Sequence, residues 1–176
     1  MIATQKDNRE RCFPSWMKRG TSSEPPHAAN ATMAAKRLHP VVHLHVFNSR
    51  GELYLQKRPQ WKDIQPGRWD TAVGGHVDLG ESVEMALRRE AEEELCLTGF
   101  TPERLPHYVF ESDRERELVF PHRCTYDGEI RPSAETDGGR FWNTTEIHEA
   151  MGKGFFTPNF ESEYKRLFGN EPDTLL

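Results

Sequence analysis

The chain has 176 residues, a net charge of −5 and 35% hydrophobic residues, which suggests one domain with a real core. The acidic balance argues against a general nucleic-acid or membrane-surface binder, and no apolar run approaches the ~20 residues that a membrane helix needs. Three widely spaced cysteines without a CxxC pair favour a reducing cytoplasm. The sequence therefore predicts a cytoplasmic protein without a nucleic-acid or membrane partner.

Residues 1–36 differ in composition from the rest of the chain, because they are small, polar and turn-rich without a clear period. We expect an irregular lead-in there. An organellar transit segment is the alternative, since acidic residues are few, although an Arg-rich amphipathic pattern is not evident. Residues 37–170 carry the regular patterns and no internal repeat. The predicted organisation is a lead-in followed by one folded domain.

The first regular pattern is HPVVHLHVFN, residues 39–48, where both alternating sets contain apolar side chains. This pattern predicts a strand that is at least partly buried on both faces. A turn at 49–51 and the run ELYLQKR, residues 52–58, would complete a hairpin. After a polar loop interrupted by prolines, the stretch WDTAVGGHV, residues 69–77, predicts a short third strand that ends at the glycines.

The strongest helical pattern covers residues 82–95, with Ser82 as a plausible N-cap and Glu84 in the first turn. Apolar residues at every fourth position would form the stripe that faces the core. This stripe consists of Val83, Leu87, Ala91 and Leu95.

Downstream patterns predict a hairpin over residues 105–112 and 116–128 and another strand over 138–144. Two short closing helices are expected over 145–154 and 159–169. Strands on both sides of one strong helix predict a mixed α/β or α+β domain.

A cluster of acidic residues lies on the predicted helix. Glu90, Glu93 and Glu94 stand at i, i+3 and i+4, so they share one face beside the apolar stripe. Like charges at this spacing repel, whereas three close carboxylates suit Mg²⁺ or Mn²⁺. The alternative is a solvated helix face with i,i+4 ion pairs. Those pairs are Glu84–Arg88, Arg88–Glu92 and Arg89–Glu93.

The stretch over residues 75–97 resembles the Nudix box, G-x5-E-x7-R-E-U-x-E-E-x-G-U, where U is a bulky aliphatic residue. The matching positions are Gly75, Glu81, Arg89, Glu90, Glu93, Glu94 and Leu97. Two positions depart from the pattern: Ala91 is small where a larger aliphatic is usual, and Cys96 replaces the second glycine. Glycine there eases a left-handed helix cap, so the cysteine affects the turn and leaves the acids intact.

The resemblance implies an α/β/α sandwich around a mixed sheet and the Mg²⁺-dependent hydrolysis of a nucleoside diphosphate linked to another group. The three clustered glutamates match the family's metal ligands, often joined by the carbonyl of Gly75, and Glu93 is favoured for helping to activate water. Arg89 and Glu81 match a supporting pair that orients the loop. Glu135 is the candidate for a further metal-binding glutamate, with a surface-loop acid as the alternative.

Further stretches between about residues 37 and 168 are similar to the isopentenyl-diphosphate isomerase-like Nudix proteins. These stretches are LHPVVHLHVFN, LQKRPQWKDIQPGRWDTAVGGHV, ERELVF and FTPNF. In the isomerases, histidines and glutamates hold a metal, and a cysteine beside the box glycine transfers a proton. The matching metal residues are His39, His76 and, as a candidate third histidine, His27, together with the acidic pair Glu115 and Glu117.

Gly74 occupies the position where the isomerases have their catalytic cysteine, and glycine cannot transfer a proton. The isomerases also usually lack the full set of acids that REAEEEL, residues 89–95, retains. Both features favour a hydrolase. An isomerase and a non-catalytic module that binds a nucleotide or sugar diphosphate remain alternatives. His39 and His76 also have a structural alternative, because a lone histidine is more often hydrogen-bonded than metal-bound.

Lys57, Arg58 and Lys62 precede the box, in the segment where the isomerases bind diphosphate, and would pair with phosphate oxygens. The alternative is a solvated basic strand end. The predicted partner is a small-molecule diphosphate and the predicted cofactor is Mg²⁺, with Mn²⁺ as a substitute. The sequence does not identify the substrate and leaves a homodimer open.

Overall fold

The computed structural model describes residues 37–169 apart from 114 and 135, so the predicted lead-in lies outside the described residues. The elements are β1 (Leu38–Phe47), β2 (Leu53–Lys57), β3 (Trp69–Thr71), β4 (Val73–His76), α1 (Val83–Leu95), β5 (Glu103–Arg104), β6 (Tyr108–Glu111), β7 (Arg116–Thr125), β8 (Gly139–Trp142), α2 (Thr144–Ala150) and α3 (Pro158–Phe168).

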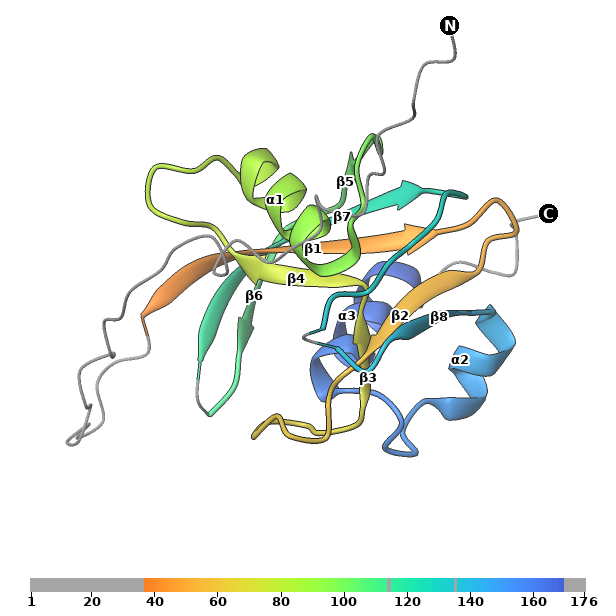
Figure 1. Cartoon of the computed structure of the whole chain (residues 1–176). Coiled ribbons are helices and arrows are strands. Elements are labelled where there is room, and N and C mark those ends of the chain that lie inside the picture. Colours follow the sequence, from red (N-terminus) through yellow and green to blue (C-terminus); the bar gives the residue numbers. More distant parts are fainter. Residues whose placement is uncertain (1–36, 114, 135, 170–176) are drawn as a thin grey trace, which may run out of the picture.

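A mixed sheet lies between two helical layers (Figure 1). Its main order is β3-β2-β1-β7-β5, and β4, β6 and β8 pair with β1, β7 and β2, respectively. The sheet is mixed because β1 runs parallel to β7 and antiparallel to β2 and β4. In Figure 1, α1 lies above the strands and α2 and α3 lie below them. The predicted α/β/α sandwich with a mixed sheet is therefore confirmed.

Strand β1 is buried on both faces, as its sequence pattern predicts. Leu44 and His45 are neighbours on opposite faces of the strand, and each is fully buried. The strand pairs with β7 along its whole length, from Leu38 opposite Arg116 to Phe47 opposite Thr125. Helices cover both faces of this central strand, which is why neither face carries the polar pattern of an exposed strand.

Helix α1 packs its apolar stripe against one face of β1. Leu87, Ala91 and Leu95 are fully buried in a core cluster that includes Val42 and Leu44. The structure adds Ala86 to the buried stripe and leaves Val83 only partly buried. Ser82 caps the helix, because its side chain accepts a hydrogen bond from the backbone N–H of Met85.

The end of α1 shows how a cysteine replaces the glycine of the box pattern. Cys96 adopts the left-handed conformation, with φ 52° and ψ 29°. Its backbone N–H donates to the carbonyl of Glu92, and that of Leu97 donates to the carbonyl of Ala91, each at 3.0 Å. The turn thus keeps the hydrogen bonds of a left-handed helix cap, at a backbone cost of about 1–2 kcal/mol for a residue that is not glycine.

A second core lies on the other face of the sheet, between β2, β8 and the closing helices. Leu53 and Leu55 of β2 pack there with Trp142, Phe156 and Phe160. Helix α3 begins after Thr157, whose side chain accepts a hydrogen bond from the N–H of Phe160, and Pro158 suits the first helical position.

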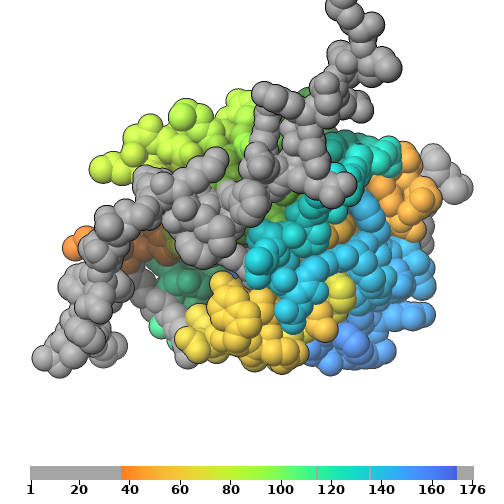
Figure 2. Space-filling model, in the orientation of Figure 1, coloured from red at the N-terminus to blue at the C-terminus, as the bar shows by residue number. Residues whose placement is uncertain are grey.

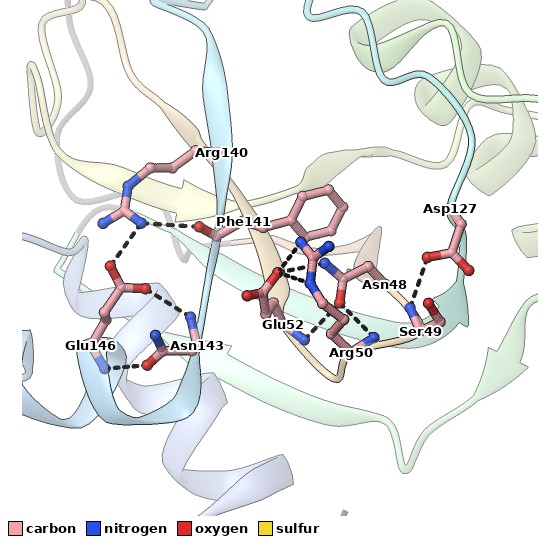
Figure 3. Close-up of polar contacts among 9 residues, drawn as sticks. All are labelled: Asn48, Ser49, Arg50, Glu52, Asp127, Arg140, Phe141, Asn143 and Glu146. Carbon is pink, nitrogen blue, oxygen red and sulfur yellow. Dashed lines mark hydrogen bonds and ion pairs between the residues drawn. The ribbon is translucent and has the colours of Figure 1, made fainter.

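Polar side chains fix the β1–β2 turn and the start of α2 (Figure 3). Asn143 accepts from the N–H of Glu146, and the Glu146 carboxylate accepts from the N–H of Asn143, both at 2.9 Å. This reciprocal pair is a capping box. In the turn, Asn48 Oδ1 accepts from the N–H groups of Arg50 and Glu52, at 3.0 and 2.9 Å.

The third predicted strand, over residues 69–77, is divided into two strands, and this prediction of a single strand is wrong. Strand β3 pairs with β2, whereas β4 pairs with β1. The chain therefore changes neighbours at Ala72 and places Gly74 and Gly75 directly beside β1. The two-residue β5 was not predicted, because its residues are polar and exposed. Among the described residues, no helix is long and apolar enough to cross a membrane.

Candidate functional site

Arg89 of α1 connects several of the predicted site residues. Its guanidinium donates to both carboxylate oxygens of Glu81 at 3.0 Å and to Glu90 Oε1 at 2.7 Å. It also donates to Glu93 Oε2 at 3.3 Å and to the backbone carbonyl of His76 at 3.0 Å. The guanidinium thereby ties the loop before α1 to the carboxylates on the helix, which is the geometry expected of a supporting pair.

Gly75 of β4 lies directly against one of the clustered acids. A Cβ atom built on Gly75 would lie 2.1 Å from Cδ of Glu90, which is far inside van der Waals contact. Only glycine allows the backbone of β4 and the Glu90 carboxylate to approach this closely.

Glu94 is held on the sheet side of the cluster. Its Oε2 accepts a hydrogen bond from Gln56 Nε2 at 3.0 Å, and the backbone N–H of Gly74 also donates to it. Burial and, after it, the nearby charge of Glu90 raise the pKa of Glu94 to about 8, against the opposing effect of the two hydrogen bonds. Burial also raises the pKa of Glu90, against the opposing effect of Arg89.

The three glutamates have the right chemistry for Mg²⁺, which prefers carboxylate oxygens. A divalent cation would also offset the mutual repulsion that resists the ionisation of Glu90 and Glu94. Within the described part of the chain, no three His, Cys, Asp or Glu residues are gathered into a ready-made metal cage. Arg89 instead neutralises Glu90 and Glu93, so a cation would have to compete with this guanidinium. Glu135 and His27, the two other candidate ligands, lie outside the described residues.

A second group of predicted residues meets beside the ends of β1 and β7. The rings of His39 and His76 stack with their centroids 5.0 Å apart, and His39 Nε2 is 3.7 Å from Glu117 Oε1. Burial raises the pKa of Glu117, and the charge of Glu115 adds to the shift. The structure thus brings these four residues near one another, while their binding of a metal stays a prediction.

The predicted basic residues do not share one partner. Arg58 Nη1 lies 3.4 Å from Asp70 Oδ2, whereas Lys62 Nζ lies 4.9 Å from the ring centroid of the exposed Trp61. Lys57 ends β2. In Figure 2, the loop between β2 and β3, in yellow, forms part of the lower front of the molecule. Of the three, Arg58 is thus the one that an acidic residue already anchors.

Sequence analysis missed a buried acid–base pair on the opposite face of the sheet. Glu163 of α3 is buried, and its Oε2 lies 2.7 Å from His43 Nδ1. Burial alone would lower the pKa of His43, but the charge of Glu163 and its hydrogen bond raise that pKa to about 9. Burial opposes the ionisation of Glu163, yet the charges of His43 and His45 lower its pKa well below the usual range. A signal existed, because Glu163 follows Phe160 at i+3 on the buried stripe of α3.

A family model described as the NUDIX domain matches residues 37–160. An uncharacterized Nudix hydrolase of Listeria monocytogenes is 38% identical over 136 residues, which cover 76% of this chain and 80% of that protein. A Listeria innocua relative of the same description is 39% identical over 72 residues, only 43% of its own length. An isopentenyl-diphosphate Delta-isomerase of Photorhabdus laumondii is 24% identical over 187 residues, covering 99% and 97% of the two chains.

Solved structures share the fold. The crystal structure of DR0079 from Deinococcus radiodurans has a TM-score of 0.67 at 24% identity, covering 80% of this chain and 90% of that one. The NUDIX domain of Shewanella oneidensis NrtR, complexed with ADP ribose, has a TM-score of 0.56 at 17% identity, covering 69% and 83%. The match to the family model over most of the chain and the Listeria monocytogenes relative together show that the chain belongs to the Nudix family.

Proposed function

We propose that the chain is a Mg²⁺-dependent pyrophosphohydrolase that cleaves a diphosphate linkage in a nucleoside diphosphate derivative or a related organic diphosphate. The observation that carries the proposal is the set of Glu90, Glu93 and Glu94 on one face of α1, with Gly75 in close approach to Glu90. The Nudix hydrolase relatives support the class of reaction. The described geometry supports the residue roles that follow.

In this proposal, each residue around the cluster has a distinct role. The Glu81–Arg89 pair orients the loop before α1, and Gln56 orients the carboxylate of Glu94. Glu93 is the most exposed of the three glutamates that accept hydrogen bonds from Arg89, and it helps to activate the attacking water. Bound Mg²⁺ supplies the charge that neutralises the diphosphate and polarises this water.

Basic residues complete the proposed site from the side of β2. Arg58 is held by Asp70 near the sheet, and it would bind phosphate oxygens through its planar guanidinium. Lys57 and Lys62 add positive charge at the end of β2 and in the loop beyond it. A cationic rim of this kind favours an anionic substrate.

An isomerase is the second candidate, because the chain matches an isopentenyl-diphosphate isomerase along nearly its whole length. Gly74 argues against it, since glycine offers no side chain for proton transfer at carbon. A non-catalytic module that binds a diphosphate is the third candidate. The NrtR domain bound to ADP ribose makes this ligand a useful member of a test panel.

The test is a panel of nucleoside di- and triphosphates, sugar nucleotides, dinucleotides, ADP-ribose and isopentenyl diphosphate, assayed with Mg²⁺ and with chelator. We expect Mg²⁺-dependent release of phosphate products from at least one compound, and a loss of about a hundredfold to a thousandfold in kcat in Glu93→Gln. Glu92→Gln is the matched control, because Glu92 is an exposed neighbour on the same helix.

Three other outcomes would contradict the proposed function or its mechanism. Full activity in a folded Glu93→Gln variant would show that the assigned mechanism is wrong. Conversion of isopentenyl diphosphate to its allylic isomer would favour the isomerase, and tight Mg²⁺-dependent binding without turnover would favour the binding module.

A further inference from the structure

Gly74 separates the acidic cluster of α1 from the buried pair His43–Glu163. Its backbone N–H donates to the Glu94 carboxylate. Gly74 is also the register partner of His43, since β4 and β1 pair antiparallel at these residues. A Cβ atom on Gly74 would lie 3.3 Å from His43 Cδ2 and 3.5 Å from His43 Nε2. A single residue without a side chain therefore stands between the imidazole edge and the glutamate.

The imidazole of His43 has one nitrogen that is fixed and one that is available. Nδ1 is hydrogen-bonded to Glu163 at 2.7 Å. Among the residues that the structure describes, the only side-chain hydrogen bond of His43 is the one at Nδ1, so Nε2 is left without a partner, and the side chain is 17% exposed. Because Glu163 is buried on α3, its carboxylate fixes the ring so that the Nε2 edge points along Gly74.

The charges around the pair keep a proton on both ring nitrogens. Glu163 is the dominant charge, and Asp70 of β3 and Glu117 of β7 act in the same direction, so the pKa of His43 is raised to about 9. Tyr108 of β6 adds a hydrogen bond to Glu163. Because the Nδ1–H of this imidazolium already donates to Glu163, the Nε2–H is the one charged N–H donor that the ring can offer to a ligand.

We propose that His43 is a substrate-contacting residue of the diphosphate site, which donates a hydrogen bond from Nε2 to a phosphate oxygen, and that Glu163 is its positioning residue. The inference rests on the proposed function, because it deepens the same site by adding a contact on the far side of Gly74. The chemistry that it recognises is a diphosphate that Mg²⁺ would hold at the carboxylates of α1, one of which, Glu94, accepts a hydrogen bond from the backbone N–H of Gly74. It also gives Gly74 a role, because any side chain there would stand between donor and substrate.

His45 provides the matched comparison. Its Nε2 is also close to Glu163, at 3.4 Å, but its side chain is fully buried and packs edge-on against Phe168. His45 thus shares the buried acid with His43 but cannot reach a ligand. If Glu163 had a purely structural role, both histidines would contribute to stability and neither would contribute to diphosphate binding.

The kinetic test uses the full chain with a substrate from the panel above. We expect His43→Gln to lower kcat/KM by about tenfold to a hundredfold, the range for a hydrogen bond to a charged group. The double variant His43→Gln/Glu163→Gln keeps a neutral pair in the core and should show the same loss with a native melting curve. His45→Gln should keep the wild-type kcat/KM. Wild-type kcat/KM in a folded double variant would overturn the inference.

A binding test separates the inference from the hydrolase function. Its probe is methylenediphosphonate with Mg²⁺, which hydrolysis cannot remove. We expect the ¹⁵N signal of His43 Nε2 to shift on titration, and the Kd to rise about tenfold in His43→Gln. No shift at Nε2 in the wild type would overturn the contact. If the wild type hydrolyses no compound but the shift and the weaker binding are seen, the hydrolase proposal fails while the contact stands.

Discussion

Two groups of acidic side chains lie on opposite faces of the central sheet, and the fold treats them differently. On α1, Glu90 and Glu93 share one guanidinium and keep 14% and 33% of their side-chain surface exposed. On α3, Glu163 keeps 1% and has a histidine fixed at 2.7 Å. Glutamate thus occurs on α1 with a partner, Arg89, that a cation could replace, and on α3 with a partner, His43, that is fixed in the folded protein.

The difference follows from desolvation. A carboxylate that retains water can exchange Arg89 for a cation at modest cost, because high dielectric weakens both interactions. A carboxylate without water depends on its partner, since an unpaired buried charge is strongly destabilising. Exposure therefore distinguishes Glu90 and Glu93, which could exchange Arg89 for a cation, from Glu163, which is suited to positioning another residue.

The largest effect on folding should come from removing the permanent partner. We expect Glu163→Ala to lower the free energy of unfolding by about 3 kcal/mol, because it leaves the largely buried imidazole of His43 without its carboxylate. Urea denaturation at neutral pH measures this loss. Glu92→Ala, at an exposed acid of α1, is the control and should change stability by less than about 1 kcal/mol. Equal losses of unfolding free energy in both variants would show that the buried acid does not depend on its partner more than an exposed acid does.

The pH dependence of the same pair tests its charge. The pKa of His43 is raised to about 9, so its contribution to stability is present below its unfolded pKa and is lost as the pH rises through about 9. The Glu163 contribution is present above its unfolded pKa and is lost only in acid, because its pKa is lowered.

We therefore expect the stability of the wild type relative to His43→Gln/Glu163→Gln to fall by about 2 kcal/mol between pH 6 and pH 10. Denaturation curves at several pH values measure the difference, and the neutral variant serves as the reference. A difference that stays constant across this range would mean that the pair is not charged.

Adding a methyl group beside the exchangeable acids should weaken metal binding. In Gly75→Ala, the new Cβ would displace the Glu90 carboxylate, and we expect the Mg²⁺ affinity to fall about tenfold, or about 1.4 kcal/mol. Calorimetric titration with Mg²⁺ measures this change. Gly51→Ala is a control for the general effect of a methyl group, since a Cβ there meets nothing within 4 Å, although its positive φ carries some strain. An unchanged affinity would argue against Glu90 as a ligand.

The smallest effect is expected on the outer face of α1. Arg88 pairs with Glu84 at 2.8 Å, but both side chains are mostly exposed or half-exposed. We expect Arg88→Ala to lower the free energy of unfolding by about 0.5 kcal/mol or less, and to leave hydrolysis unchanged. Thermal melting and the phosphate-release assay test both statements. A large loss of activity in Arg88→Ala would mean that this side of α1 also takes part in hydrolysis, in addition to the three glutamates.

The sequence was most informative where structure depends on near neighbours. Ser82, the stripe at Leu87 and Leu95, and the spacing of the acids all lie within one helix, so period and capping rules predict them. The interaction of Arg89 with Glu81 spans only eight residues and follows from the matched box. The resemblance to a known family added the mixed sheet and its layers, which local patterns alone do not specify.

The missed features depend on partners far apart in the chain. The division of 69–77 into β3 and β4 is decided by which strand each half pairs with, and no local pattern shows that choice. Glu163 was missed because its partner His43 is 120 residues away. Gln56 was missed for the same reason, since its bond to Glu94 spans 38 residues.

The distance along the chain between His43 and Glu163 has a consequence for the order of folding. Helix α1 can form from its own turns as soon as it is synthesised, whereas β1 must wait for β7 and then for α3. A chain that has reached only β7 still lacks the carboxylate that neutralises His43 in the interior. Among the described elements, α3 comes last in the chain and completes the polar interior beneath β1, so a chain that ends before α3 should be degraded by proteases more readily.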